Sequence, residues 1–185
     1  MNKNLFSSEG NSLLLIIDVQ EKLVQNILNK SNLIKNINKL IEVASLLKID
    51  VIYSEQNPSK LGKSLVNKSQ YISSSVYEKM CFNCLDNSKL YHALEKSKKK
   101  RIVVCGVESH ICIKQTCLSL ENEGYEPYLI VDAISSRNLI DHETAIASLL
   151  ANKISIGTTE SIIFEWCKTA DRDEFRKISS IIKSN

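Results

Sequence analysis

The sequence lacks the features that would assign a chain to a functional class by composition alone. Its 24 basic and 21 acidic residues leave a net charge of 24 − 21 = +3, too small to predict a nucleic-acid or anionic-membrane partner. It has no internal repeat, low-complexity linker or second domain. We therefore expect one domain over residues 1–185, long enough for a full hydrophobic core, with residues 1–12 as a loose tail.

Long apolar runs are also missing. The N-terminus is polar up to Ser12, and the apolar run over residues 13–17 stops at Asp18. Such a run is too short for a signal-peptide core or a membrane span. We therefore expect a cytoplasmic protein without a membrane partner, in which the six cysteines are reduced.

Metal-ligand spacings are scarce as well. Cys81 and Cys84 are separated as in some zinc and redox sites, but no second Cys or His pair stands at a suitable spacing. A thioredoxin-like pair would open a helix directly after the first strand, whereas this pair lies in mid-chain. The sequence therefore favours structural cysteines here and predicts neither a metal nor a cofactor.

Apolar runs typical of buried strands alternate with segments of helical period along the chain. Alternation of this kind predicts a three-layer α/β fold with a mostly parallel, doubly wound, six-stranded sheet. The cluster from Lys98 to Arg101 is interpreted as a solvated helix end, and Ser31 as a helix N-cap. The predicted strands are 13–17, 49–53, 74–77, 102–105, 127–131 and 153–156, and the predicted helices are 31–47, 85–100, 111–124, 141–151, 161–168 and 173–182.

One stretch combines a strand, a sharp turn and a helix. Residues 102–105 are apolar and mostly β-branched, Gly106 is expected to end the strand, and a helical period begins at Ile111. This places Cys112 in the first turn of a helix, where unpaired N–H groups and the helix dipole favour a thiolate. Two interpretations fit the spacing: a nucleophile, or an inert buried cysteine that begins a core helix.

Two charged residues also follow predicted strands. Asp18 follows residues 13–17 and Lys79 follows residues 74–77, and the carboxyl ends of parallel strands gather at one edge of a sheet. An aspartate there is commonly a turn or capping residue, and most lysines are solvated surface charges. A cation beside a cysteine would stabilise its thiolate, so we predict that Asp18, Lys79 and Cys112 converge on one cleft.

Five motifs in order resemble the isochorismatase-like cysteine hydrolase superfamily, and most closely its branch of isochorismatase domain-containing proteins. The similarity runs from about Leu13 to Ile182. The motifs are Leu-Ile-Ile-Asp-Val-Gln at 15–20, Ser-Glu-Gln-Asn-Pro at 54–58 with Leu61-Gly62, Lys79 with Phe82, Gly-Val-Glu-Ser-His-Ile-Cys-Ile at 106–113, and the tail motifs Asp-Ala-Ile-Ser-Ser-Arg at 132–137 and Thr-Thr-Glu at 158–160.

The resemblance implies a catalytic triad of Asp18, Lys79 and Cys112. In that scheme Lys79 stabilises the thiolate, Asp18 moves protons, and Cys112 attacks an acyl carbon to form a thioester that water cleaves. The resemblance also implies an oxyanion hole formed by the amides of Glu108 and Cys112, and a cis peptide bond between Val107 and Glu108.

The same resemblance implies a substrate pocket that includes Gln20, Gln56, Phe82 and His110. For Gln56 an ordinary role in loop hydrogen bonding fits equally well. His110 is only two residues from Cys112, too close for a Cys–His dyad, so we interpret it as structural or pocket-lining. The other histidines, His92 and His142, are expected on the surfaces of helices.

Departures from better-known members of the superfamily narrow the substrate. Nicotinamidases carry an Asp and His metal site after the second strand, but residues 54–62 contain neither residue type, so we expect no catalytic metal. Isochorismatases that hydrolyse a vinyl ether lack this cysteine, so Cys112 argues for a small-molecule amide, or less readily an ester. Two alternatives stay open: a redox-responsive thiol protein and a catalytically silent binding or scaffold subunit.

The resemblance further implies a homo-oligomer. Candidate contact residues would equally suit the core, and the sequence gives no stoichiometry. They are Leu149, Leu150, Phe164 and Trp166.

Overall fold

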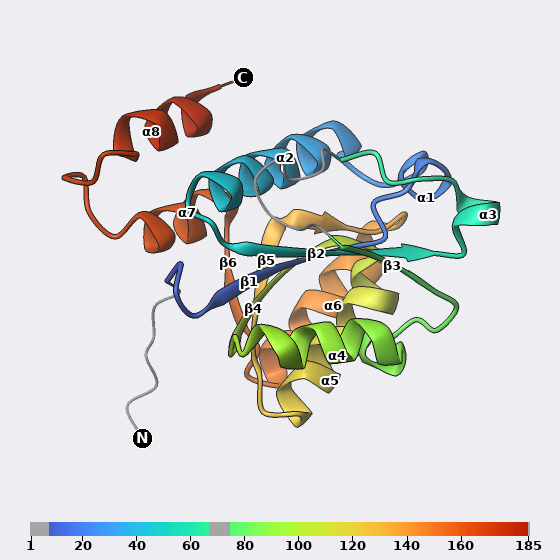
Figure 1. Ribbon diagram of the computed structural model, residues 1–185. Helices are drawn as coiled ribbons and strands as arrows, with labels where there is room; N and C mark the ends of the chain where they lie inside the picture. Colours follow the sequence, from blue (N-terminus) through green and yellow to red (C-terminus); the bar gives the residue numbers. More distant parts are fainter. Residues whose placement is uncertain (1–7, 67–74, 185) are drawn as a thin grey trace.

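The computed structural model describes residues 8–66 and 75–184, which form a sheet of six parallel strands with helices on both faces (Figure 1). The strand order is β3-β2-β1-β4-β5-β6. The predicted three-layer, doubly wound α/β fold is therefore confirmed. The strands are β1 (Ser12–Ile17), β2 (Asp50–Gln56), β3 (Ser75–Lys79), β4 (Arg101–Val107), β5 (Glu126–Ser135) and β6 (Ser155–Gly157).

Helices cover the sheet from both sides, and short turns lie where the chain leaves the strands (Figure 1). One face is covered by α2 (Lys30–Leu46) and α7 (Thr159–Cys167), with α8 (Phe175–Lys183) packed against these two helices, and the other face by α4 (Ser88–Ser97), α5 (Lys114–Asn122) and α6 (Leu139–Ala151). The short elements are α1 (Glu21–Val24), α3 (Pro58–Leu61), the 3₁₀ turn η1 (Cys84–Asp86) and the π-helical turn η2 (Ser109–Ile113).

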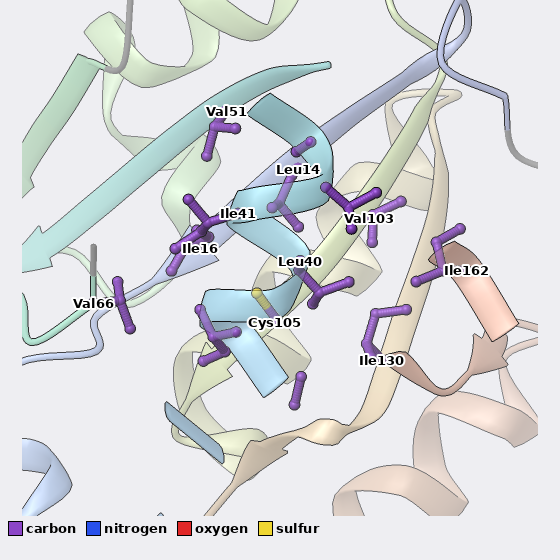
Figure 2. Close-up of a cluster of buried hydrophobic side chains, with 14 of the residues drawn as sticks. Leu14, Ile16, Leu40, Ile41, Val51, Val66, Val103, Cys105, Ile130 and Ile162 are labelled. Atoms are coloured by element: carbon purple, nitrogen blue, oxygen red, sulfur yellow. The ribbon is translucent and has the colours of Figure 1, made fainter. Parts of the chain in front are cut away.

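The central strands are buried on both faces, which explains why their sequences are continuous apolar runs. Successive residues of β1 point to opposite sides of the sheet. Leu14 and Ile16 therefore join the core beneath α2 and α7, which Figure 2 shows, while Leu13, Leu15 and Ile17 join the core beneath α4 and α5. Two apolar layers thus hold the carboxyl ends of β1 and β4 in place.

The chain reverses direction across the sheet between β1 and β4. It runs outward from β1 through β2 to β3 and then returns to β4 on the other side of β1. In open parallel sheets the crevice outside the carboxyl ends at such a point is the usual ligand site. Asp18 follows β1 and Cys112 follows β4, so both lie at this crevice.

Gly106 does not end β4, contrary to the prediction from sequence. Its backbone has φ +120°, and a side chain there would overlap the backbone of Ile17 in β1. Glycine therefore allows the two strands to approach closely and lets β4 continue to Val107.

β5 is longer than predicted and continues through residues 132–135, which the sequence suggested as a loop. A register shift between Val104 and Gly106 in β4 lets β5 resume pairing, with Ile134 opposite Gly106. The carboxyl end of β5 is thereby extended alongside the segment that precedes Cys112.

Several helix boundaries also differ from the predictions. α2 begins at Lys30 after Asn29 in a left-handed conformation, so Ser31 is not its N-cap. The predicted helix over 85–100 is divided into η1 and α4, because the side chain of Asn87 accepts a hydrogen bond from the backbone of Leu90 and starts a new helix. Arg101 is buried in β4 against Glu126 and is not part of a solvated helix end.

The first residue of the predicted third strand, Ser74, and residues 1–7 of the predicted tail lie outside the described residues. The strand itself is present as β3, and β1 begins at the buried Ser12. Among the helices of residues 8–66 and 75–184, none has the length and apolarity needed to cross a bilayer.

Candidate active site

Asp18 is held at the end of β1 by backbone and side-chain hydrogen bonds. Its backbone is left-handed, with φ +53°, and its N–H donates to the carbonyl of Ser54 in the neighbouring strand at 3.1 Å. The side chain is fully buried. The Ser54 hydroxyl donates to its Oδ1 at 2.8 Å, and the Lys79 ammonium donates to its Oδ2 at 2.7 Å.

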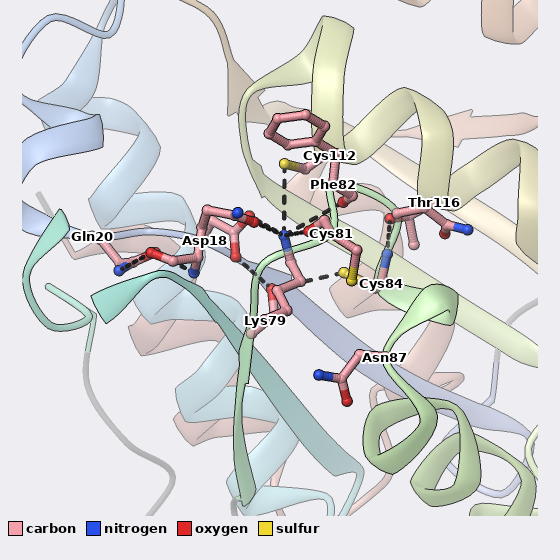
Figure 3. Close-up of polar contacts among 12 residues, drawn as sticks. Asp18, Gln20, Lys79, Cys81, Phe82, Cys84, Asn87, Cys112 and Thr116 are labelled. Atoms are coloured by element: carbon pink, nitrogen blue, oxygen red, sulfur yellow. Dashed lines mark hydrogen bonds and ion pairs between the residues drawn. The ribbon is translucent and has the colours of Figure 1, made fainter. Parts of the chain in front are cut away.

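Lys79 is the last residue of β3, and its nitrogen lies at the centre of the site (Figure 3). It contacts the carboxylate of Asp18 and lies 3.7 Å from the Cys112 sulfur. Three oxygens complete its surroundings: Gln56 Oε1 at 2.7 Å and the carbonyls of Cys81 at 3.2 Å and Phe82 at 3.4 Å. Few lysines are so deeply buried, and the ammonium of this one donates to oxygen atoms and to the Cys112 sulfur.

The charge state of Lys79 follows from two opposing effects. Burial lowers its pKa, but the Asp18 carboxylate raises it by charge and hydrogen bonding, and the net shift is upward. Lys79 is therefore an ammonium at neutral pH. It is suited to stabilising negative charge and unsuited to accepting a proton.

Cys112 lies in η2, the first helical turn after β4, and is 6% exposed. Burial raises the pKa of its thiol, the Asp18 carboxylate raises it further by charge and hydrogen bonding, and Lys79 lowers it by less. The net effect is a protonated thiol, which reverses the sequence-based expectation of a thiolate. The reason is that desolvation and a neighbouring carboxylate outweigh the lysine and the helix start.

The turn that leads to Cys112 has a defined backbone. The peptide bond between Val107 and Glu108 is cis, as the family resemblance implied. The N–H groups of Ile111 and Ile113 both donate to the Glu108 carbonyl, at 3.1 and 3.3 Å. Backbone bonds on both sides of Cys112 thus fix the turn that carries it.

Side chains of the same turn are tied to the segment that follows β5. The buried Glu108 carboxylate accepts from the backbone N–H of Arg137 at 3.1 Å and from its Nε at 3.2 Å. The Nδ1 atom of His110 lies 3.0 Å from the Ser136 hydroxyl. His110 therefore makes structural contacts, one of the two roles predicted for it.

His142 makes a third contact of this kind, which the sequence did not predict. It was expected on a helix surface, but it is half-buried and its Nδ1 lies 2.9 Å from the Ser109 hydroxyl. Burial lowers its pKa. No local pattern marks this residue, because its contact depends on how α6 packs against η2.

Gln20 does not line a pocket, contrary to the expectation from the family resemblance. It is fully buried, its Nε2 donates to the carbonyls of Gln56 at 3.0 Å and Gly62 at 2.7 Å, and its Oε1 accepts from the Gln56 N–H at 2.7 Å. Because its amide bonds only backbone groups, Gln20 instead fixes the carboxyl end of β2.

Gln56 and Phe82 lie nearer to the reacting groups. The Gln56 amide nitrogen donates to the Met80 carbonyl at 2.8 Å while its oxygen accepts from Lys79, so Gln56 combines loop bonding with contact to the site. Phe82 is 53% exposed, and Figure 3 shows its ring on the same side of the lysine nitrogen as the Cys112 sulfur. Phe82 is therefore the predicted pocket residue that presents an apolar side chain.

The Cys81 and Cys84 pair is not joined, and all six cysteines of the chain are unpaired. Cys84 is fully buried beneath the site, with its sulfur 3.7 Å from the Ser54 hydroxyl and its N–H bonded to Thr116 Oγ1 at 3.0 Å. Burial raises the pKa of Cys84 to about 11. In the described part of the chain no group of three potential metal-ligating side chains occurs.

Comparisons with known proteins point to one family. The isochorismatase domain model matches residues 12–161. Isochorismatase family protein 1B of Dictyostelium discoideum is 30% identical over 177 residues, covering 93% of this chain and 86% of that protein.

Solved structures with the same fold include two informative examples. The MAR1 ribonuclease of Caenorhabditis elegans superposes with a TM-score of 0.91 and 26% identity, over 97% of this chain and 93% of that one. The YcaC gene product of Escherichia coli, described as an octameric hydrolase of unknown specificity, superposes with a TM-score of 0.90 and 18% identity, over 98% and 91% of the two chains.

Proposed function

This chain belongs to the isochorismatase family, and from that membership and the geometry of its cleft we propose a metal-independent cysteine hydrolase that cleaves an amide-type bond of a small molecule. The observation that carries the proposal is the position of the Lys79 ammonium, 2.7 Å from the Asp18 carboxylate and 3.7 Å from the Cys112 sulfur. Each of the three groups comes from the end of a different strand or the turn after it.

The first step transfers the thiol proton. Cys112 is protonated at rest, and the Asp18 carboxylate, which raises the pKa of that thiol, accepts its proton as sulfur attacks the carbonyl carbon. The S–C bond forms while the carbonyl electron pair moves to oxygen. Lys79 stays an ammonium and stabilises the negative charge on carboxylate and sulfur.

The second step breaks the C–N bond. The tetrahedral oxyanion would be held by the amides of Glu108 and Cys112, whose turn is fixed by the backbone bonds to the Glu108 carbonyl. As the carbonyl re-forms, Asp18 returns the proton to the leaving nitrogen. Water then attacks the thioester carbon, and Asp18 accepts a proton from that water. As the carbonyl re-forms, the C–S bond breaks and releases the Cys112 thiolate, which takes the proton back from Asp18.

The donor set of the cleft supports a reaction carried by protein groups. Residues 54–62 at the end of β2 contain neither aspartate nor histidine, and the buried acidic residue of the site, Asp18, already bonds Ser54 and Lys79. A cation would have to compete with the Lys79 ammonium for the same carboxylate oxygen. We therefore include metal independence in the proposal.

Small amides are favoured over RNA as substrates, although one structural relative is named a ribonuclease. RNA binding depends on clustered exposed basic side chains, but the net charge here is only +3 and the catalytic-site lysine is buried. Phe82, whose carbonyl lies 3.4 Å from the Lys79 nitrogen, has an exposed aromatic side chain that suits a small organic substrate. RNA is included in the test below as the competing outcome.

We propose that the chain forms a homo-oligomer in a reducing, cytoplasm-like compartment. The six unpaired cysteines suit such a compartment. Of the four apolar residues predicted as interface or core, Leu149 and Trp166 are fully buried, whereas Leu150 and Phe164 are 46% and 43% exposed and remain available for contact. Sedimentation of the protein at increasing concentration tests this point.

Intact-mass spectrometry after incubation with an amide library, together with product analysis, tests the proposed reaction. We expect a covalent acyl adduct and turnover in the wild type, and neither in Cys112→Ala. Cys81→Ala is the matched control, because Cys81 is half-exposed and contributes only its backbone carbonyl to the site. This variant should keep the acyl adduct and the turnover. Adducts that persist in Cys112→Ala, or cleavage of RNA in place of amides, would overturn the proposal.

A further inference from the structure

We infer that Ser54 is a positioning residue for the reaction: its hydroxyl holds the Asp18 carboxylate in the orientation that accepts the Cys112 proton. This inference rests on the proposed hydrolase function. It adds a fourth residue to the three that the family resemblance implied, and its side chain contacts the carboxylate directly.

The two oxygens of Asp18 have different partners. Ser54 Oγ donates to Oδ1 at 2.8 Å, and Lys79 Nζ donates to Oδ2 at 2.7 Å. A carboxylate turns easily about the bond that carries it, because that torsion has broad minima. One donor on each oxygen fixes the plane of the group, and this plane presents the carboxylate to both Lys79 and the thiol.

The groups of this arrangement are shielded from bulk solvent. Asp18 is fully buried, and Ser54 and Lys79 are 2% and 3% exposed. If the Ser54 hydroxyl were removed, no solvent would be at hand to replace it as a donor. The ionised carboxylate would then lose a hydrogen bond that stabilises its charge, and its orientation would depend on Lys79 alone.

Ser54 is itself held in place from two sides. It lies in β2 opposite Ile17 of β1, and its carbonyl accepts the Asp18 N–H at 3.1 Å, so the two backbones are joined at this position. The thiol of Cys84 donates to Ser54 Oγ at 3.7 Å. With that lone pair occupied, the hydroxyl hydrogen is directed to Asp18. Cys84 thereby acts on the site through Ser54.

The pH dependence of Cys112 alkylation by iodoacetamide, followed by intact mass, tests the inference without knowledge of the substrate. Ser54→Thr and Ser54→Val are a matched pair, since the two side chains have nearly the same shape and only threonine carries a hydroxyl. In Ser54→Val we expect Cys112 to be alkylated about 10-fold more slowly at the pH that is optimal for the wild type. The rise of the alkylation rate with pH should move upward by about one pH unit. Ser54→Thr should keep the wild-type pH dependence.

The same variants are then compared in turnover of the amide found in the library. Ser54→Val should lower kcat by about 10- to 100-fold with little change in KM, because the contact acts on proton transfer and not on substrate binding. Ser59→Ala is a control for loss of a serine hydroxyl away from the site; its partner is Asn57 at 2.9 Å.

Two outcomes separate this inference from the proposed function. If Cys112→Ala keeps full turnover, the hydrolase mechanism fails. If Cys112→Ala is inactive, but Ser54→Val and Ser54→Thr have the same pH dependence and rate of Cys112 alkylation and the same kcat, only the role of Ser54 fails. Denaturant midpoints of the matched pair show whether both are folded. If Ser54→Val is unfolded while Ser54→Thr is folded and active, the difference between them is still due to the hydroxyl. A Ser54→Thr variant that is folded but inactive would overturn the inference.

Discussion

The two sides of the cleft are built differently. The carboxylate side consists of Ser54, Asp18 and Lys79, and both side chains of its ion pair are completely buried. The turn side consists of residues 108–110 and the segment 136–142 that holds them. Its ion pair joins a buried Glu108 to an Arg137 that is 57% exposed, at 3.2 Å.

This difference follows from what each side is proposed to do. Proton transfer to a carboxylate depends on excluding water, which would otherwise compete for the proton and screen the charges. The turn side only has to keep a backbone in place, which hydrogen bonds at the surface can do. Substitutions on the carboxylate side should therefore lower both the stability of the protein and its turnover. Substitutions on the turn side should mainly lower turnover.

Removal of the Lys79 charge should have the largest effect. Lys79→Met leaves Asp18 as an unpaired buried carboxylate, so we expect a loss of about 3–5 kcal/mol in the free energy of unfolding, and no turnover. Urea denaturation measures the stability. Lys60→Met, at an exposed lysine of α3, is the control and should unfold like the wild type.

A double variant sharpens this prediction. Asp18→Asn combined with Lys79→Met removes both buried charges, so it should recover most of the stability lost in Lys79→Met and still have no activity. If the single Lys79→Met variant has the wild-type denaturation midpoint, the buried ion pair does not make the carboxylate side more important for stability than the turn side.

The two sides should respond to opposite changes of pH. On the carboxylate side the pKa of Cys84 is raised from 9.0 to about 11, so the unfolded chain loses this proton first as pH rises. Stability is therefore full below pH 9 and falls by about 2–3 kcal/mol through pH 11 from this thiol. The raised pKa of Lys79 acts in the same direction at higher pH.

On the turn side burial lowers the pKa of His142. The unfolded chain then binds this proton more readily than the folded one, so stability is present above about pH 6.5 and falls as pH drops below it. Denaturation at a series of pH values measures both limbs. Cys84→Ala should make the alkaline limb shallower, and the rest of that limb comes from the buried thiols of Cys105, Cys112 and Cys117, whose pKa values burial also raises. His142→Asn should make the acid limb shallower. A variant that changes the other limb would contradict the assignment.

Removal of the Arg137 side chain should have the smallest effect on stability. Arg137→Ala keeps the backbone N–H that bonds Glu108 but loses the bond from Nε. We expect a change of less than about 1 kcal/mol in the free energy of unfolding, because the lost guanidinium is largely exposed and the buried Glu108 carboxylate keeps its bond from the Arg137 backbone N–H. Turnover should fall by roughly 10-fold, since the Glu108 amide is less well fixed.

Arg176→Ala, at an exposed arginine of α8, is the matched control for loss of a surface guanidinium. It should leave both stability and turnover unchanged. If Arg137→Ala lowers stability as much as Lys79→Met, the two sides of the cleft do not differ in the way described.

Much of this architecture could be predicted from local patterns. The continuous apolar runs of β1 and β4 indicated strands buried on both faces, and their alternation with helices indicated the parallel sheet. Ligands bind at the carboxyl ends of such strands, and this rule predicted from sequence that Asp18, Lys79 and Cys112 lie in one cleft. The structure places the three side chains in contact there.

Other features depend on contacts between distant parts of the chain and had no local signal. Gln20 stood in a family motif, yet its amide bonds only backbone groups, those of Gln56 at the end of β2 and of Gly62 after α3. The contact of His142 with Ser109 exists only because α6 packs against η2. Gly106 carried the pattern of a strand end, but its role is to let β4 lie close to β1.

The order of apolar and polar residues thus determined the strands, the helices and the edge at which the charged side chains meet, because periodicity and side-chain chemistry act over short distances. The protonation state of the site was decided by the tertiary structure. A cysteine at a helix start favours a thiolate when considered alone, but burial beside Asp18 raises the pKa of Cys112 and keeps it a thiol. Desolvation and the distance between charges exist only once β3, β2, β1 and β4 are packed into one sheet, and these two quantities set the chemistry of the site.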